Sequence, residues 1–414
     1  MSKNSIRRIS TTILALCALC INTYANDGEF HISGNHLIPI SNTDIKIVKE
    51  VLTIRLCDST EDTFVDVDYT FVNTSSVQKT IKMGFEAKIE DSFAYLPSEK
   101  HKGHPAIWDF EVELNGKHIE HTNEFAFYED SVNLDYKHFP VDKTKWVLGG
   151  KEYKDMDEGT EWDNGLMNRA TKEFKPYAHV YFFNATFLPG ENKIHHTYRY
   201  DCGRNLEEDF MIRYWLTPAM RWNANKIEDF TLRIVAEGSK HFSISGPFAR
   251  GSYNIANGMG KHRKSPYGGE EVVLRNATIE YHCKDFIPDA DLWINSFDSY
   301  LYDDKDHKGI TAPTGAYYRY GHFFGYLQHG YEGFNDFEKR IIRNLPYASR
   351  GYVFKDQTLA DYFSQFYWYM PDPEWQASTK DFSPREREFI TGEYFNINQV
   401  PKVKNLRNIR SKRK

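Results

Sequence analysis

The chain has 414 residues, a formal net charge of −6, 40% hydrophobic residues and 15% aromatic residues. This length predicts two or three domains, and the composition is sufficient for ordinary globular cores. The acidic balance argues against nucleic-acid binding by the body of the protein, because such binding needs a basic surface. The 27 Tyr and 29 Phe residues favour β-sheets, on which aromatic side chains pack well.

Residues 1–25 have the pattern of a secretory signal peptide. Lys3, Arg7 and Arg8 supply a positive start, and residues 9–21 form a short apolar run that ends near small residues. This run is too short to span a bilayer, and no later segment is apolar enough to do so. We therefore expect an exported protein with no transmembrane segment after cleavage.

The cysteines allow little covalent stabilisation. Cys17 and Cys20 raise the alternative of a lipoprotein, but each follows a Leu where a lipid-attachment motif needs a small residue. Cleavage leaves Cys57, Cys202 and Cys283, which is an odd number. At most one pair can form a disulfide, and the sequence does not decide which.

From residue 26 to about residue 290 the pattern is mainly that of β-strands. Residues 63–71 and 110–114 alternate apolar and polar side chains, which is typical of half-buried strands. Asn115-Gly116 predicts a hairpin turn, because both residues tolerate positive φ. Further strand-like runs cover residues 45–56, 180–188, 193–200, 230–236 and 272–283. Many short strands separated by turns predict an antiparallel β-sandwich-like region.

Residues 152–163 are rich in carboxylates and are expected to form a loop. Because Ca²⁺ takes about six to eight oxygen ligands, a calcium site is one interpretation. Its candidate ligands are Asp155, Asp157, Glu161 and Asp163. Tryptophans flank the stretch, so the paired carboxylates of a glycan hydrolase are a second interpretation. A solvated acidic loop without a cofactor is the more ordinary one.

The histidines are poorly spaced for a metal site. His118 and His121 are three residues apart and His195 and His196 are adjacent, so in strands the members of each pair face opposite sides. The motifs of zinc proteases, serine hydrolases and phosphate-binding loops are absent from the sequence. These observations favour a non-catalytic protein over an enzyme.

Three segments near the start of the β-rich region carry a resemblance. Residues 26–30 read Asn-Asp-Gly-Glu-Phe, residues 34–39 read Gly-Asn-His-Leu-Ile-Pro, and residues 49–52 read Lys-Glu-Val-Leu. They resemble the beginning of a secreted bacterial domain family of unknown function. The resemblance implies a periplasmic or surface location without naming an activity.

The C-terminal part predicts a compact helical unit. Residues 336–344 form a charged, helix-like run that is expected to end at Pro346. Spacing of i, i+3, i+4 and i+7 places four apolar residues on one helical face. They are Leu359, Tyr362, Phe363 and Phe366.

This unit resembles the YARHG domain, a small module of bacterial extracytoplasmic proteins. Residues 347–351 read Tyr-Ala-Ser-Arg-Gly, so Ser and Arg occupy the third and fourth positions of the name motif. The flanking matches are Arg343-Asn344, Gly351-Tyr352-Val353-Phe354, Leu359, Tyr362-Phe363, Trp368-Tyr369 and Pro371. The resemblance implies an exported binding module without naming its ligand, and Arg350 replaces the motif histidine.

The aromatic residues of this unit have two interpretations. They form the core of a domain of about 60 residues, which needs large side chains to bury enough area. Alternatively, a minority forms an exposed platform beside cations, which suits sugars or acidic peptides. The candidate ligand-binding residues of this platform are Arg343, Arg350, Lys355, Trp368, Tyr369 and Trp375.

The expected fold class is α+β, mostly β. The expected units are a signal peptide (1–25), a β-rich sandwich-like region (26–290), a connecting segment (291–333), a YARHG-like helical domain (334–396) and a basic disordered tail (397–414). The expected function is non-catalytic recognition of an envelope glycan or extracellular protein ligand, in the periplasm or at the cell surface. The alternatives are a glycan hydrolase and a structural subunit of an envelope assembly.

Overall fold

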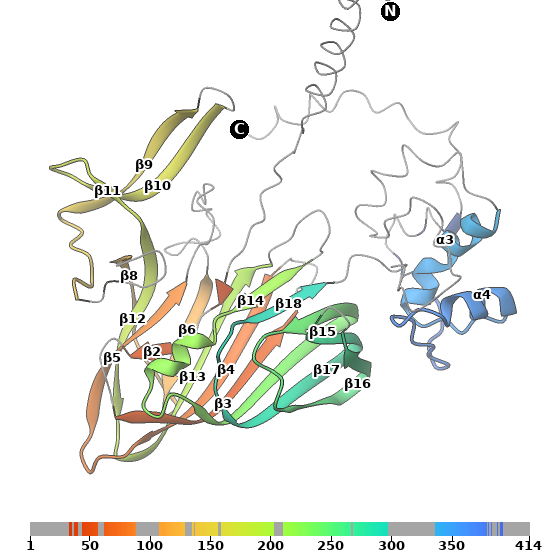
Figure 1. Ribbon diagram of the computed structural model, residues 1–414, viewed down its shortest axis with the longest axis horizontal. Helices are drawn as coiled ribbons and strands as arrows, with labels where there is room; N and C mark the ends of the chain where they lie inside the picture. Colours follow the sequence, from red (N-terminus) through yellow and green to blue (C-terminus); the bar gives the residue numbers. More distant parts are fainter. Residues whose placement is uncertain are drawn as a thin grey trace, which may run out of the picture.

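The computed structural model describes residues 33–34, 37–39, 44–56, 62–87, 107–128, 135, 137–155, 159–202, 210–265, 268–296, 336–378, 380, 382, 387 and 390–391. In these residues the fold is mostly β with a small helical part, as predicted (Figure 1). The expected signal peptide and basic tail lie outside the described residues, as does most of the connecting segment.

The larger sheet forms one layer of the β-rich region. Its strand order is β1-β14-β18-β15-β3-β4-β13-β6-β7, and β17 and β16 are added beside β15. Its strands are β1 (Ser33–Gly34), β3 (Ile45–Arg55), β4 (Asp62–Asn73), β6 (Trp108–Leu114), β7 (Lys117–His118), β13 (Gly190–Asp201), β14 (Met211–Tyr214), β15 (Ile227–Ser245), β16 (Ser252–Lys264), β17 (Glu270–Phe286) and β18 (Leu292–Ser296). A short 3₁₀ helix, η2 (Thr217–Arg221), follows β14.

A four-stranded sheet packs against this layer and completes the sandwich. Its order is β2-β5-β12-β8, and its strands are β2 (Leu37–Pro39), β5 (Lys79–Ala87), β8 (Thr122–Phe127) and β12 (Tyr177–Phe187). Ring pairs join the layers: Phe71 and Phe187 lie 5.5 Å apart between centroids, and Phe85 and Tyr198 lie 4.8 Å apart. Each such aromatic pair contributes about 0.5–1.5 kcal/mol beyond the area it buries.

The alternation seen in the sequence explains the layering. In β4 the side chains of Val65, Val67 and Tyr69 are buried in the sandwich core, whereas Asp66 and Asp68 face outward. The turn after β6 has positive φ at Asn115 (52°) and Gly116 (74°), as the hairpin prediction required.

The sandwich, which is mainly antiparallel as expected, also contains two parallel strand pairs that the sequence did not predict. β3 pairs with β15 in parallel from Lys49↔Asp229 to Arg55↔Val235, and β1 pairs with β14 in parallel. A parallel pair needs a long connection between its strands, and here most of the β-rich region lies between them. Such a pairing leaves no mark on the alternation within either strand.

The acidic stretch is a β-hairpin rather than the expected loop. It belongs to β9 (Trp146–Asp155) and β10 (Gly159–Asn168), which with β11 (Phe174–Lys175) form a separate sheet extending beyond the sandwich (Figure 1). The two strands pair in an antiparallel register from Gly159↔Asp155 to Asn168↔Trp146. Asp155 and Glu161 lie in these strands, and Asp157 lies outside the described residues. Calcium binding there stays a prediction.

The C-terminal unit contains α3 (Asp336–Ser349) and α4 (Gln357–Phe363). α3 continues through Pro346, so the predicted end at this proline was wrong. Proline removes one helical hydrogen bond, but its φ is compatible with a helix. Leu345 and Ala348 in the last turn are buried in the core of the unit, and this packing favours the longer helix. Residues 359, 362, 363 and 366 are all buried, as their spacing predicted.

The helical unit packs against β15, β16 and β17 at one end of the larger sheet (Figure 1). Val273 of β17 belongs to the apolar core of the unit, and Met259 of β16 packs against it. The buried Arg275 donates a hydrogen bond from Nη2 to the Met370 carbonyl oxygen at 2.8 Å. Lys261 donates to the Tyr369 carbonyl oxygen at 3.1 Å. The sheet therefore holds the helical unit by both apolar and charged contacts.

Two of the three cysteines outside the expected signal peptide are described. Cys202 is disulfide-bonded, whereas Cys283 is a free, buried thiol. Cys57 lies outside the described residues. Burial in an apolar strand makes the Cys283 thiol a packing group rather than a nucleophile.

Among the described residues, no helix combines the length and the apolar character needed to cross a bilayer.

Candidate functional site: a cationic pocket on the helical unit

The outward face of α3 carries most of a polar pocket. Asp336, Lys339, Arg340, Arg343 and Tyr347 recur at spacings of three or four residues or their sums, so they follow one side of the helix. The opposite side, with Ile341, Leu345 and Ala348, is buried. This division of α3 places charged side chains at the surface and leaves the apolar stripe for the core.

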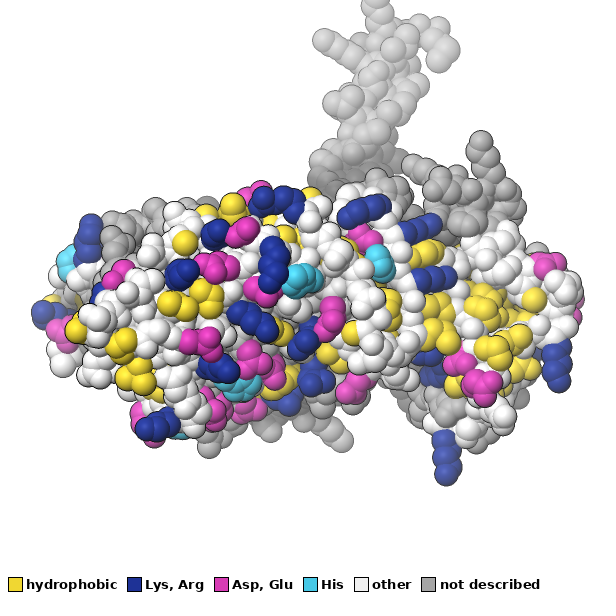
Figure 2. Space-filling model, turned by 90° about the horizontal axis from the view of Figure 1, so that it is seen from below, with side chains coloured by type: hydrophobic (Ala, Val, Ile, Leu, Met, Phe, Trp, Pro, Cys, Tyr) yellow, Lys and Arg dark blue, Asp and Glu magenta, His cyan; other side chains and the backbone are white. Residues whose placement is uncertain are grey.

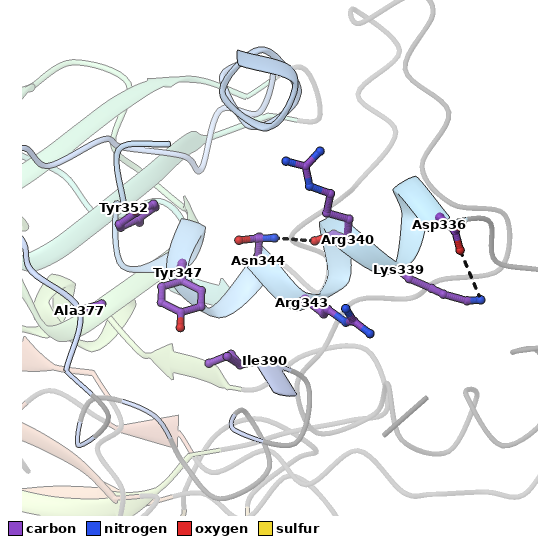
Figure 3. A pocket seen from close by; sticks show the side chains of 9 residues that line it. All are labelled: Asp336, Lys339, Arg340, Arg343, Asn344, Tyr347, Tyr352, Ala377 and Ile390. Atoms are coloured by element: carbon purple, nitrogen blue, oxygen red, sulfur yellow. Dashed lines mark hydrogen bonds and ion pairs between the residues drawn. The ribbon is translucent and has the colours of Figure 1, made fainter. Parts of the chain in front are cut away.

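The pocket has a volume of about 720 Å³. It is lined by Asp336, Lys339, Arg340, Arg343, Asn344, Tyr347, Tyr352, Ala377 and Ile390. In Figure 3 the side chains of Arg343 and Tyr347 leave α3 on the same side, where Ile390 lies, and Arg340 leaves on the other side. A cation, an aromatic ring and an aliphatic side chain therefore border the same space.

The turn that ends α3 brings the second tyrosine to the pocket. Gly351 has φ +86°, and its N–H donates to the Ala348 carbonyl oxygen at 2.9 Å. The N–H of Tyr352 donates to the Tyr347 carbonyl oxygen at 3.0 Å, which completes a Schellman motif. The two tyrosine rings lie 5.7 Å apart between centroids. Positive φ suits glycine, so the last residue of the name motif positions Tyr352 against Tyr347.

The pocket has an excess of positive charge. Three cations line it, against the single carboxylate of Asp336, whose oxygen lies 4.0 Å from the Lys339 ammonium. Arg340 is 2.5 Å from the Asp356 carboxylate, and its hydrogen bond is the main cause that lowers the pKa of Asp356. Asp356 also caps α4 by accepting a hydrogen bond from the Leu359 N–H at 3.1 Å. This salt bridge fixes Arg340 relative to α4.

The surface of the molecule differs between the β-rich part and the helical unit (Figure 2). Figure 2 shows Lys, Arg, Asp, Glu and His side chains mixed across the β-rich part, whereas apolar side chains gather toward the helical end. Exposed apolar patches with a polar rim often mark interaction sites.

The structure does not bring the predicted platform residues together. Trp368 and Tyr369 are only 6% and 7% exposed and lie in the core of the unit, so their expected exposure was wrong. Their rings are needed to fill a small core, which is the interpretation that the sequence left open beside the platform. The Tyr369 hydroxyl donates to the Tyr352 carbonyl oxygen at 2.7 Å and thereby braces the turn under the pocket.

The other four predicted residues lie apart. Arg343 lines the pocket. Arg350 donates to the Pro346 carbonyl oxygen at 3.0 Å and places its guanidinium 4.9 Å from the Phe382 ring centroid. Lys355 is exposed outside the pocket lining, and Trp375 is half-buried with its ring 6.4 Å from that of Tyr352. Arg350, which stands in place of the motif histidine, is therefore engaged in closing the end of α3.

Sequence reasoning missed several pocket residues. Lys339 and Arg340 entered only as part of a charged helix, and Asn344, Tyr347 and Tyr352 entered through the YARHG resemblance or as core aromatics, not as ligand-binding residues. The helical spacing of residues 336, 340, 343 and 347 was the available signal. Sequence spacing could not predict that Ile390 lines the pocket, because its position depends on how the chain after α4 returns to α3.

Residues 326–392 match the YARHG domain. The match includes both helices, the Schellman turn and all the residues that line the pocket. It confirms the resemblance stated from residues 343–371, and the helical unit is called the YARHG domain below.

Solved structures show more distant similarity. A Legionella pneumophila protein described as a candidate nutrient-binding protein is 18% identical with a TM-score of 0.49, and the match covers 88% of this chain and 99% of that one. Leukotriene A4 hydrolase from Saccharomyces cerevisiae is 9% identical with a TM-score of 0.20, covering 58% of this chain and 29% of that one. Aminopeptidase A of Legionella pneumophila is 9% identical with a TM-score of 0.22, and the match covers 63% of this chain and 22% of that one. No curated protein has a significant match to the chain.

Proposed function

We propose that the protein is an exported binding protein of the cell envelope, and that its YARHG domain holds an anionic envelope glycan in the cationic pocket. The observation that carries this proposal is the placement of Arg343 and Tyr347 on the same side of α3, where both line one pocket. The signal-peptide pattern of residues 1–25 and the YARHG match support export.

The lining suits a sugar that carries a carboxylate. An arginine guanidinium pairs with a carboxylate through two parallel hydrogen bonds, which gives both strength and direction. The face of a tyrosine ring packs against the apolar face of a sugar, while its hydroxyl remains available for a hydrogen bond. A volume of about 720 Å³ lies in the usual range for small-ligand sites, so the pocket accommodates a short segment of a chain rather than a broad surface.

Arg343→Gln tests this proposal most directly. The change removes one charge from the pocket and leaves the buried stripe of α3 untouched. A hydrogen bond to a charged group contributes about 1.5–3 kcal/mol, so affinity for an acidic envelope polysaccharide is expected to fall about tenfold or more. The measurement is isothermal titration of the purified chain with acidic and neutral polysaccharide fragments.

Lys355→Gln is the matched control. It removes the same charge from an exposed position of the same domain but outside the pocket lining. The control is expected to bind as the unchanged protein does. Equal loss in both variants would mean that only the overall charge matters, and equal binding by both would reject the pocket.

A version ending near Gly333, which lacks both helices, separates the YARHG domain from the β-rich region. Loss of binding on truncation supports the domain as the ligand module. Release of sugar fragments during the titration would instead favour the glycan hydrolase, and stable co-purification of other envelope proteins would favour a structural subunit.

A further inference from the structure

A mixed cluster of carboxylates and imidazole lies on the outward face of the larger sheet, in the β-rich region and away from the YARHG domain. The Nδ1 atom of His195 lies 3.0 Å from Oδ1 of Asp68 and 3.6 Å from Oδ1 of Asp66. One ligand atom from each of the three residues falls within 4.8 Å of the others.

Strand geometry produces this convergence. Asp66 and Asp68 are two residues apart in β4, so both project from the same face of the sheet. His195 of β13 is directly opposite Asp68 in the antiparallel register. Paired side chains in such a register have Cβ atoms about 4.5–5.5 Å apart, which is close enough for their tips to share one ion.

The neighbouring strands carry further polar residues on the same face, and the His118 ring lies 3.3 Å from the Glu111 carboxylate. On the other side of His195, Glu113 of β6 is its paired residue, and His118 of β7 is in turn paired with Glu113. The outward face therefore carries His118, Glu113, His195 and Asp68 in one row across four adjacent strands. His195 and its sequence neighbour His196 face opposite sides of the sheet, so the sequence did not predict a site there. Pairing between strands nevertheless places a carboxylate residue on each side of His195, Asp68 in β4 and Glu113 in β6.

The spacing matches the coordination shell of a small divalent cation. Zinc binds imidazole nitrogen and carboxylate oxygen at about 2.0–2.2 Å, which in a tetrahedral site places ligand atoms about 3.3–3.6 Å apart. Nδ1 of His195 lies 3.0 Å from Asp68 and 3.6 Å from Asp66, close to this range, and the three ligand atoms all fall within 4.8 Å of one another. A donor set of one nitrogen and two oxygens is typical of sites for first-row transition metals.

We propose that Asp66, Asp68 and His195 form a binding site for a divalent first-row transition metal. Nδ1 of His195 faces both carboxylates, so it is the ligating nitrogen. A metal bound at this atom would take the place of the contact between Nδ1 and Asp68.

Zinc titration of the purified, tag-free chain tests the site. The unchanged protein is expected to take up one Zn²⁺ with saturable heat, and Co²⁺ in its place should give a visible d–d absorption band. His195→Gln and Asp68→Asn are each expected to weaken binding by about tenfold or more. Far-UV circular dichroism checks that both variants fold.

His282→Gln is the matched control. His282 lies on the same sheet and pairs with Asp229 at 2.7 Å, but Lys284 also contacts that carboxylate at 2.6 Å and supplies a positive charge. This variant is expected to bind zinc as the unchanged protein does. Absence of saturable uptake, or equal affinity in His195→Gln and the unchanged protein, would show that the cluster is only an ion pair and would overturn the proposal.

Discussion

Gly351→Ala should detach the YARHG domain from the sheet. Gly351 has φ +86°, and a Cβ at this position would lie 2.2 Å from Nη1 of Arg275 and 2.5 Å from the Met370 carbonyl oxygen. The methyl group therefore needs the space that the buried Arg275 uses to reach that same oxygen. The left-handed backbone and the contact with the sheet both demand glycine here.

The expected cost has two parts. A non-glycine residue in the left-handed region costs about 1–2 kcal/mol. Displacement of Arg275 removes a buried, charge-assisted hydrogen bond, which is worth about 1.5–3 kcal/mol. The free energy of opening of the YARHG domain should therefore fall by about 2.5–5 kcal/mol, a large share of the stability of a small domain.

Gly190→Ala is the control, because Gly190 has nearly the same positive φ as Gly351 but an added Cβ there would meet no neighbouring atom. Gly190 begins β13 with φ +85°, and nothing lies within 4 Å of its added Cβ. Its substitution should cost only the backbone part, about 1–2 kcal/mol, and only in the β-rich region.

Hydrogen-exchange mass spectrometry measures both effects in one experiment, because it reports the opening of separate segments. Peptides from residues 336–378 should lose protection in Gly351→Ala and keep it in Gly190→Ala. The reasoning would be refuted if these peptides exchanged as slowly in Gly351→Ala as in the unchanged protein.

Two further changes probe the interface and the response to pH. Arg275→Met removes the donor to Met370, so protection of the YARHG domain should fall by about 1.5–3 kcal/mol in the same exchange experiment, and unchanged protection would contradict this role. Burial lowers the pKa of His179 from 6.5 to about 4. Between these values the unfolded chain binds a proton that the folded chain does not, so stability falls with falling pH by up to about 3 kcal/mol. His179→Gln should flatten the pH dependence of the urea midpoint between pH 6.5 and 4, and an identical dependence in both proteins would refute this expectation.

The alternation in β4 shows how far local pattern reaches. Hydrophobicity along residues 63–71 assigned Val65, Val67 and Tyr69 to the core and Asp66 and Asp68 to the surface, and the structure agrees. The partner of Asp68 could not be assigned in this way, because His195 is 127 residues further along the chain. Any outward-facing side chain of another strand was an equally good partner until the register was known.

The YARHG domain shows the same division. The spacing of residues 359, 362, 363 and 366 was enough to predict their shared buried face. It could not say that Trp368 and Tyr369 complete that core, because they follow the helix in an irregular segment without a period. The prediction of a loop at residues 152–163 was wrong for a related reason. Carboxylate residues have low strand propensity, but pairing between β9 and β10 outweighs this local preference.

By itself, the sequence determined the β-rich character of residues 26–290, the hairpin turn at Asn115-Gly116, the apolar face of α4 and the YARHG resemblance. These features depend on side-chain periodicity and on backbone preferences within a few residues. Only the tertiary structure decided the parallel pairing of β3 with β15, the neighbours of His195 and the contact between Gly351 and Arg275. Each of these joins residues that are distant in the chain, and the local pattern is compatible with many such pairings. The pocket and the proposed metal site both depend on such contacts between residues that are distant in the chain.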